Sequence, residues 1–132
     1  MVKLYYAVLF CIITTTCFSQ TQFEMNQDIK KDYEKANKEL NDVYNKPLTE
    51  YKEDIAFIKN IKTAQRFWIQ FRDAEMKAKY PDREPGYYGS IQPLCWYSYL
   101  TGLTTERTNT LKTWLTGIEE GDVCSGSVNM KE

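Results

Sequence analysis

The sequence contains no histidine among its 132 residues. Histidine is the commonest general acid or base, so its absence removes the usual nucleophile–histidine triads. The chain also lacks a Gly-x-Ser-x-Gly elbow, a phosphate-binding loop and any cluster with metal-ligand spacing. We therefore expect a protein that is not an enzyme and that uses no cofactor and no metal.

The sequence has no excess of either charge. Lys and Arg number 17 and Asp and Glu number 18, which gives a formal net charge of −1. This balance lacks the basic footprint of a nucleic-acid-binding protein, so we expect no nucleic acid as a partner. A hydrophobic content of 42% with 27% charged residues is typical of a folded chain, and 132 residues predict one domain.

The N-terminal segment does not have the pattern of a folded domain. Lys3 precedes an apolar run from Leu4 to Ile13, and small residues occupy the −3 and −1 positions before a cut after Ser19. This order is typical of a secretory signal peptide over residues 1–19, and the apolar run is too short to span a bilayer. We expect an exported protein, periplasmic or secreted. The alternative is an outer-membrane lipoprotein acylated at Cys17, although the threonines before Cys17 lack the leucine usual at such sites.

Cleavage after Ser19 would leave two of the four cysteines, Cys95 and Cys124. An even pair outside the reducing cytosol favours a disulfide. Closing a loop of about 30 residues would contribute about 3–4 kcal/mol in the chain-entropy model. A zinc site is the alternative, but two thiols without histidine make a poor ligand set.

Periodic apolar residues predict helices. From Phe23 to Asn45 they recur at intervals of three and four, and the stripe resumes beyond Pro47. Since proline removes a backbone donor, we expect a kink at Pro47 and a turn near Asp54. Asp54 is placed to cap a second helix from Ile55 to about Lys79.

The stretch AQRFWIQFRDAE, residues 64–75, mixes large apolar side chains with polar ones. Gln65, Trp68 and Arg72 are three and four residues apart, so they stack on one side of a helix. A guanidinium on the indole ring contributes about 0.5–2 kcal/mol. We expect these residues to form a partly buried network between helices; the alternative is a strip that faces a partner.

The acidic residues of this stretch allow two interpretations. We expect Arg107, from the third helix, to pair with Asp73 or Glu75. The alternative is catalytic, because a carboxylate pair with one raised pKa could cleave a glycosidic bond. Salt-bridge roles are far commoner for such residues, so we favour the structural interpretation.

Residues 80–93, YPDREPGYYGSIQP, predict a long loop before the third helix. Tyrosine offers a large contact area at low entropic cost, so the loop residues proposed to bind a partner are Tyr87, Tyr88, Gly89 and Ser90. The alternative is that one tyrosine folds back over the bundle and the other is merely exposed. The third helix is expected from Leu94, interrupted at Gly102 and capped again by Thr104.

Four segments together resemble a known family. They are EMNQDIKKDYEKANKELNDVY (24–44), IKTAQRFWIQFRDAE (61–75), GS (89–90) and LTTERTNTL (103–111). In order and spacing these are similar to the lysozyme inhibitor LprI-like family of small secreted bacterial proteins. The matching motif residues, which we expect to be mainly structural, are Glu24, Met25, Asn26, Leu40, Asn41, Tyr44, Ala64, Gln65, Trp68, Phe71, Arg72, Asp73, Thr104, Arg107 and Leu111.

The resemblance implies a secreted helical binder with lysozyme as a candidate target. Family members often carry cysteines where this chain has Asp28 and Met76, so the usual disulfide pattern of the family is absent and Cys95 with Cys124 would replace it.

The expected architecture is an all-α bundle of about three helices with a disulfide-tethered tail. Residues 1–19 would be the signal peptide, 20–116 the helical domain and 117–132 the polar tail. The expected function is that of an exported non-catalytic binding protein, with occlusion of a lysozyme cleft as the mechanism. The alternatives are a periplasmic accessory or immunity-type protein that binds another envelope protein, and a carboxylate-based cell-wall glycosidase.

Overall fold

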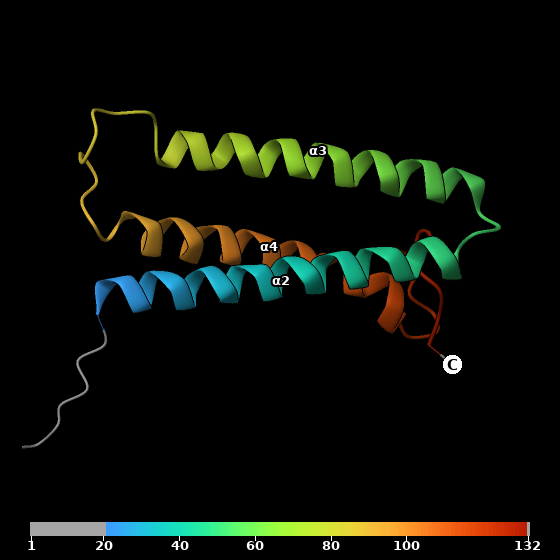
Figure 1. Cartoon of the computed structure of the whole chain (residues 1–132). Helices are drawn as coiled ribbons and strands as arrows, with labels where there is room; N and C mark the ends of the chain where they lie inside the picture. The colour runs from blue at the N-terminus through green and yellow to red at the C-terminus, as the bar shows by residue number, and fades with distance from the viewer. Residues whose placement is uncertain (1–20, 132) are drawn as a thin grey trace, which may run out of the picture.

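The computed structural model describes residues 21–131, so the expected signal peptide and Cys17 lie outside it. Three helices follow one another: α2 (Gln22–Glu50), α3 (Ile55–Lys79) and α4 (Gln92–Thr116) (Figure 1). Over the described range, the only β-type pairing is an isolated bridge between Ile118 and Met130. The prediction of an all-α fold with three helices is confirmed.

The first helix, α2, begins with a reciprocal cap. The Thr21 hydroxyl accepts a hydrogen bond from the Glu24 backbone N–H at 3.2 Å, and the Glu24 carboxylate accepts one from the Thr21 N–H at 2.9 Å. This capping box satisfies two backbone donors that the helix itself leaves unpaired. The motif residue Glu24 therefore has a local structural role.

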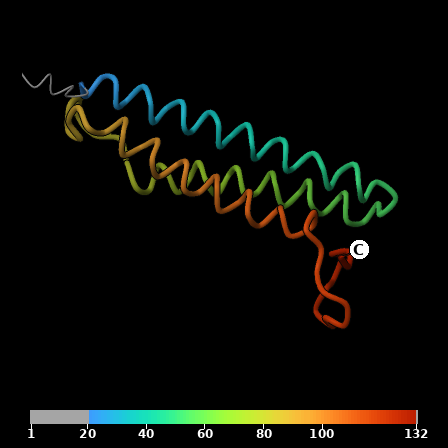
Figure 2. Tube along the Cα trace, turned by 90° about the horizontal axis from the view of Figure 1, so that it is seen from below, coloured from blue at the N-terminus to red at the C-terminus, as the bar shows by residue number. Residues whose placement is uncertain are grey.

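Near its other end, α2 continues through Pro47 to Glu50. The predicted continuation is confirmed, but the expected kink is not apparent in the course of α2 in Figures 1 and 2. Pro47 lies in the last turn, where its side chain is buried and its carbonyl accepts a hydrogen bond from the Tyr51 N–H at 2.9 Å. The helical hydrogen bond that Pro47 cannot donate is therefore lost only in the last turn of α2.

The second helix, α3, has the predicted bounds. The Asp54 carboxylate accepts a hydrogen bond from the Phe57 N–H at 2.9 Å and so caps α3. The third helix, α4, departs from prediction, since it begins at Gln92 and runs without interruption through Gly102. Thr104 is not a cap: it is fully buried in mid-helix, and its hydroxyl donates to the Leu100 carbonyl at 2.8 Å. Packing against α2 outweighs the cost of about 1 kcal/mol for a glycine in a helix.

The helices α2 and α4 pack closely along their length, whereas α3 stands further from both (Figures 1 and 2). The core lies where α2 turns into α3, and its buried members are Leu40, Val43, Tyr51, Phe57, Ile61 and Leu111. The apolar spacing of α3 through Ile61, Trp68 and Phe71 predicts that Phe71 is buried, but it is 55% exposed. The prediction was wrong because the far half of α3 has no third helix against its outer side.

The polar tail is held by hydrogen bonds. The Tyr51 hydroxyl donates to the Trp114 carbonyl at 2.9 Å and accepts from the Asn129 N–H at 3.0 Å. The Trp114 indole N–H donates to the Ser127 hydroxyl at 3.1 Å. These contacts bring the tail back against the junction of α2 and α4.

The disulfide predicted between Cys95 and Cys124 is not confirmed, since both cysteines are free thiols in this structure. Cys95 lies in the first turn of α4, whereas Cys124 follows its last turn. A helix rises about 1.5 Å per residue, so Cys95 is roughly 30 Å from the end of α4. The tail would have to leave its contacts with Tyr51 and Trp114 to reach back that far.

Candidate functional site

An aromatic cluster closes the end of the molecule where α3 connects to α4. The connection, residues 80–91, is called the aromatic loop below. Tyr80 contacts Tyr88 edge-on, with ring centroids 5.7 Å apart, and lies 5.5 Å from the Trp96 ring on α4. Burial raises the pKa of the Tyr80 hydroxyl. This cluster attaches the loop to both helices.

The two neighbouring tyrosines of the loop have different environments. Tyr88 turns back, and its hydroxyl donates to the Pro81 carbonyl at 2.7 Å. Tyr87 packs edge-on against Tyr88 at 4.9 Å but is itself 67% exposed. The Arg83 guanidinium lies over the Tyr87 ring, 5.8 Å from the ring centroid. One tyrosine therefore supports the loop, and the other is available to a partner.

Two glycines give this loop its shape. Gly86 and Gly89 have φ angles of 83° and 71°, which side chains rarely adopt, although neither position is crowded. The next residue, Ser90, offers its carbonyl to the Asn26 side-chain amide at 3.2 Å. A motif residue at the start of α2 thus holds the loop, a contact between residues 64 positions apart in sequence. The loop and its two flanking helices border a surface cavity of about 380 Å³.

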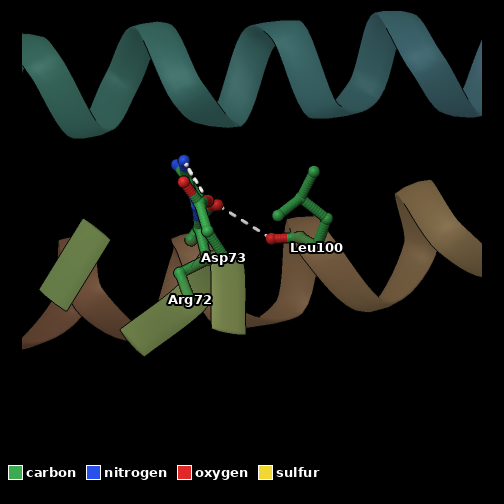
Figure 3. Close-up of polar contacts among 4 residues, drawn as sticks. Arg72, Asp73 and Leu100 are labelled. Carbon is green, nitrogen blue, oxygen red and sulfur yellow. Dashed lines mark hydrogen bonds and ion pairs between the residues drawn. The ribbon is translucent and has the colours of Figure 1, made fainter. Parts of the chain in front are cut away.

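The strip of Gln65, Trp68 and Arg72 lies along α3, with each of the three residues buried or partly buried. Gln65 is buried and Trp68 packs against the core. The Arg72 guanidinium lies 5.3 Å from the Trp68 ring centroid, so the predicted cation–π contact is present. Its Nη2 also pairs with the Asp73 carboxylate at 2.8 Å; Figure 3 shows this pair together with Leu100 of α4.

The predicted partner of Arg107 was wrong. Its Nε donates to the Gln65 side-chain oxygen at 2.9 Å, and no ion pair is formed by Arg107 within residues 21–131. Asp73 already pairs with its neighbour Arg72, and Glu75 accepts a hydrogen bond from the Tyr99 hydroxyl at 2.9 Å. The network joins α3 to α4 as expected, but through an amide and a phenol.

Catalysis by Asp73 and Glu75 is disfavoured by their placement. Residues two positions apart on a helix project about 200° apart, so the two carboxylates cannot flank one glycosidic bond. Asp73 is an exposed residue in an ion pair. Glu75 accepts a hydrogen bond from the Tyr99 hydroxyl, and this bond raises the pKa of Tyr99. The bond is a structural contact between α3 and α4.

The remaining motif residues divide between core and surface. Leu40, Thr104 and Leu111 are buried between α2 and α4. Tyr44 is partly buried, and desolvation raises the pKa of its hydroxyl while nearby Arg107 opposes the shift. Asn41 is exposed on α2, and nothing in the structure explains its place in the motif.

One side of α3 carries an exposed apolar stripe, although the apolar spacing predicted burial for all its members except Phe67. Its members are spaced three and four apart and are all exposed: Ala64, Phe67, Phe71, Ala74 and Ala78. Phe67 and Phe71 are 57% and 55% exposed. This spacing forms a second line beside that of Phe57, Ile61, Trp68 and Arg72, which are buried or partly buried.

No group of three or more Cys, Asp or Glu side chains within 21–131 could hold a metal ion. In the same range, none of the helices has the length and apolar character needed to cross a bilayer.

The family model described as lysozyme inhibitor LprI matches residues 16–111, which include α2, α3, the aromatic loop and most of α4. No curated protein and no solved structure matches the chain.

Proposed function

The chain belongs to the lysozyme inhibitor LprI family, and on this basis we propose that it is an exported protein that binds a lysozyme and blocks its substrate cleft without doing chemistry itself. The observation that carries the proposal is the family match over residues 16–111. The structure adds a surface suited to binding.

We place the contact at the aromatic loop. An exposed aromatic side chain on a supported loop loses little conformational entropy on binding, because its backbone is already ordered. Tyr87 meets this description, since Tyr88 packs against it and the Asn26 amide holds the loop at Ser90. The loop projects from one end of the bundle (Figure 1), a shape that suits entry into a concave cleft.

Charge supports the same surface. Asp82 and Glu84 flank Arg83 in the loop, and all three border its cavity. Exposed acids of this kind favour association with a basic enzyme surface, mainly through the association rate. Added salt should therefore slow binding more than it speeds dissociation.

The proposal is tested by following the lysis of a bacterial cell-wall suspension by lysozyme, with and without the purified protein in micromolar excess. Slowed lysis supports the proposal, and an unchanged rate overturns it. Tyr87→Ala should weaken inhibition at least about tenfold, as expected for a central aromatic anchor.

Phe67→Ala is the matched control, because it removes another exposed aromatic ring at the surface of α3. It should inhibit like the unaltered protein. If Phe67→Ala loses inhibition and Tyr87→Ala keeps it, the contact lies on the apolar stripe of α3 and our placement at the loop is wrong. Circular dichroism of both variants checks that the helices remain folded.

Export is tested separately by mass spectrometry of the mature protein from its native cells. A chain that begins at Gln20 supports a signal peptide of residues 1–19, ahead of the helical domain 20–116 and the tail 117–132. A lipid-modified chain that begins at Cys17 would instead establish the lipoprotein alternative.

A further inference from the structure

A second cavity lies at the opposite end of α3 from the aromatic loop. It has a volume of about 390 Å³ and is bordered by the first half of α3, the C-terminal half of α4 and the tail. Its wall is mainly apolar, with Phe57, Ile61 and Ala64 from α3 and Trp114 from α4. A volume near 400 Å³ is within the range of small-molecule sites in proteins.

Arg107 is the cation in this wall. A guanidinium carries five N–H donors, and the only side-chain hydrogen bond of Arg107 to residues 21–131 is the one from Nε to Gln65. Arg72, in contrast, has the Asp73 carboxylate as its partner. The acid in the cavity wall, Asp54, is engaged as the cap of α3.

The position of Arg107 is set by the fold. Gln65 is buried and fixes Nε, so the guanidinium is oriented before any ligand arrives. The side chain is partly buried, and this desolvation lowers the pKa of Arg107 while Tyr44 opposes the shift. Arginine remains charged under all ordinary conditions, so Arg107 is a partly desolvated cation beside an apolar wall, without an anionic partner among residues 21–131.

We propose that this cavity binds an organic carboxylate, with the Arg107 guanidinium holding the carboxylate and the rings of Phe57 and Trp114 holding an apolar group next to it. Arginine pairs with carboxylates through two parallel hydrogen bonds, which gives both strength and orientation. The two terminal nitrogens of the Arg107 guanidinium make no hydrogen bond to residues 21–131, so they can donate to both carboxylate oxygens. This site is separate from the aromatic loop and does not depend on lysozyme binding.

The test uses nuclear magnetic resonance of the ¹⁵N-labelled mature protein titrated with phenylacetate. Saturable shifts should be confined to the cavity, at Phe57, Ile61, Ala64 and the Trp114 indole. Phenylacetamide has the same ring but no charge, so it should bind at least about tenfold more weakly. Equal binding of acid and amide, or no shift at these residues, overturns the proposal.

The source of the carboxylate is distinguished by a second pair of probes. These are an acetylated dipeptide that ends in phenylalanine with a free C-terminus, and the same dipeptide as its amide. Tighter binding of the free-acid dipeptide than of phenylacetate supports a polypeptide C-terminus as the ligand. Tighter binding of phenylacetate supports a free organic acid.

Variants test the role of the guanidinium. Arg107→Gln should lose at least about tenfold in affinity for phenylacetate, whereas the exposed Arg66→Gln on α3 should not change it. Because Arg107→Gln could also unfold the protein, Ala64→Leu provides a second test, since it fills the cavity and leaves the guanidinium in place. Unchanged affinity in a folded Arg107→Gln or Ala64→Leu variant contradicts the proposal.

Discussion

The tether of the tail can be tested by replacing Tyr51 with phenylalanine. Tyr51 is 6% exposed, and its ring packs against Phe57 at a centroid distance of 4.6 Å. Tyr51→Phe keeps this packing and removes only the hydroxyl. That hydroxyl makes two hydrogen bonds, to the Trp114 carbonyl and from the Asn129 N–H.

The expected loss follows from these two bonds. A hydrogen bond in a protein contributes about 0.5–1.5 kcal/mol net, and a buried group left without a partner costs about 1–3 kcal/mol. Asn129 is exposed, so its N–H can turn to water, whereas Trp114 is only partly accessible. We expect Tyr51→Phe to lower the free energy of unfolding by about 1–3 kcal/mol.

Two measurements check this value. Urea denaturation gives the change in the free energy of unfolding. Hydrogen exchange reports on the tail itself, where the amide of Asn129 should exchange at least about tenfold faster, since a tenfold change corresponds to about 1.4 kcal/mol. Tyr33→Phe is the matched control, because Tyr33 is partly buried and its ring packs against Tyr97 with centroids 5.8 Å apart, but its hydroxyl makes no hydrogen bond to the described residues.

The control should stay within about 0.5 kcal/mol of the unaltered protein. If Tyr51→Phe matches the control in stability, and the Asn129 amide keeps its exchange rate, then the hydroxyl does not tether the tail. The close packing of the tail against α2 and α4 would then need another cause.

Three further predictions concern the core, the pH dependence and the thiols. Leu111→Ala should cost about 3–5 kcal/mol in urea denaturation, because this side chain is fully buried between α2 and α4. The hydrogen bond to Glu75 raises the pKa of Tyr99 in the folded protein. The stabilisation that this bond gives is therefore present below the ordinary tyrosine pKa of about 10, and it is lost as the pH rises through the raised pKa of the folded state. Tyr99→Phe should therefore flatten the fall in urea midpoint above about pH 10, and an unchanged slope would contradict this assignment. In the native protein a thiol reagent should modify exposed Cys124 quickly and partly buried Cys95 slowly, whereas a chain with no reactive thiol would show that the two are paired.

Local signals in the sequence predicted much of the helical framework. The bounds of α3 were predicted because Asp54 caps its first turn and the proline- and glycine-rich segment from Pro81 follows its last. The resemblance to the LprI family was likewise visible from short motifs, and the family match confirms it. Caps, apolar spacing and motifs act within a few residues, so a single sequence is enough to recognise them.

Interruptions within helices were harder to predict. Gly102 suggested a break in α4, but the helix is continuous, with Thr104 buried a short distance beyond it. Pro47 suggested a kink, but it lies in the last turn of α2. In both cases the outcome depends on burial against another helix, and propensity describes only the isolated segment.

The sequence by itself determined which segments are helical, which polar residues gather in the middle of α3, and to which family the chain belongs. Only the tertiary structure decided which partner each of those residues takes. Gln65 was recognisable as a motif residue, but its contact with Arg107 joins positions 42 apart and depends on how α3 lies against α4. The same holds for Phe71, whose exposure reflects where α3 leaves the other two helices. Periodicity defines the faces of a helix, and the packing of all three helices decides which face is covered.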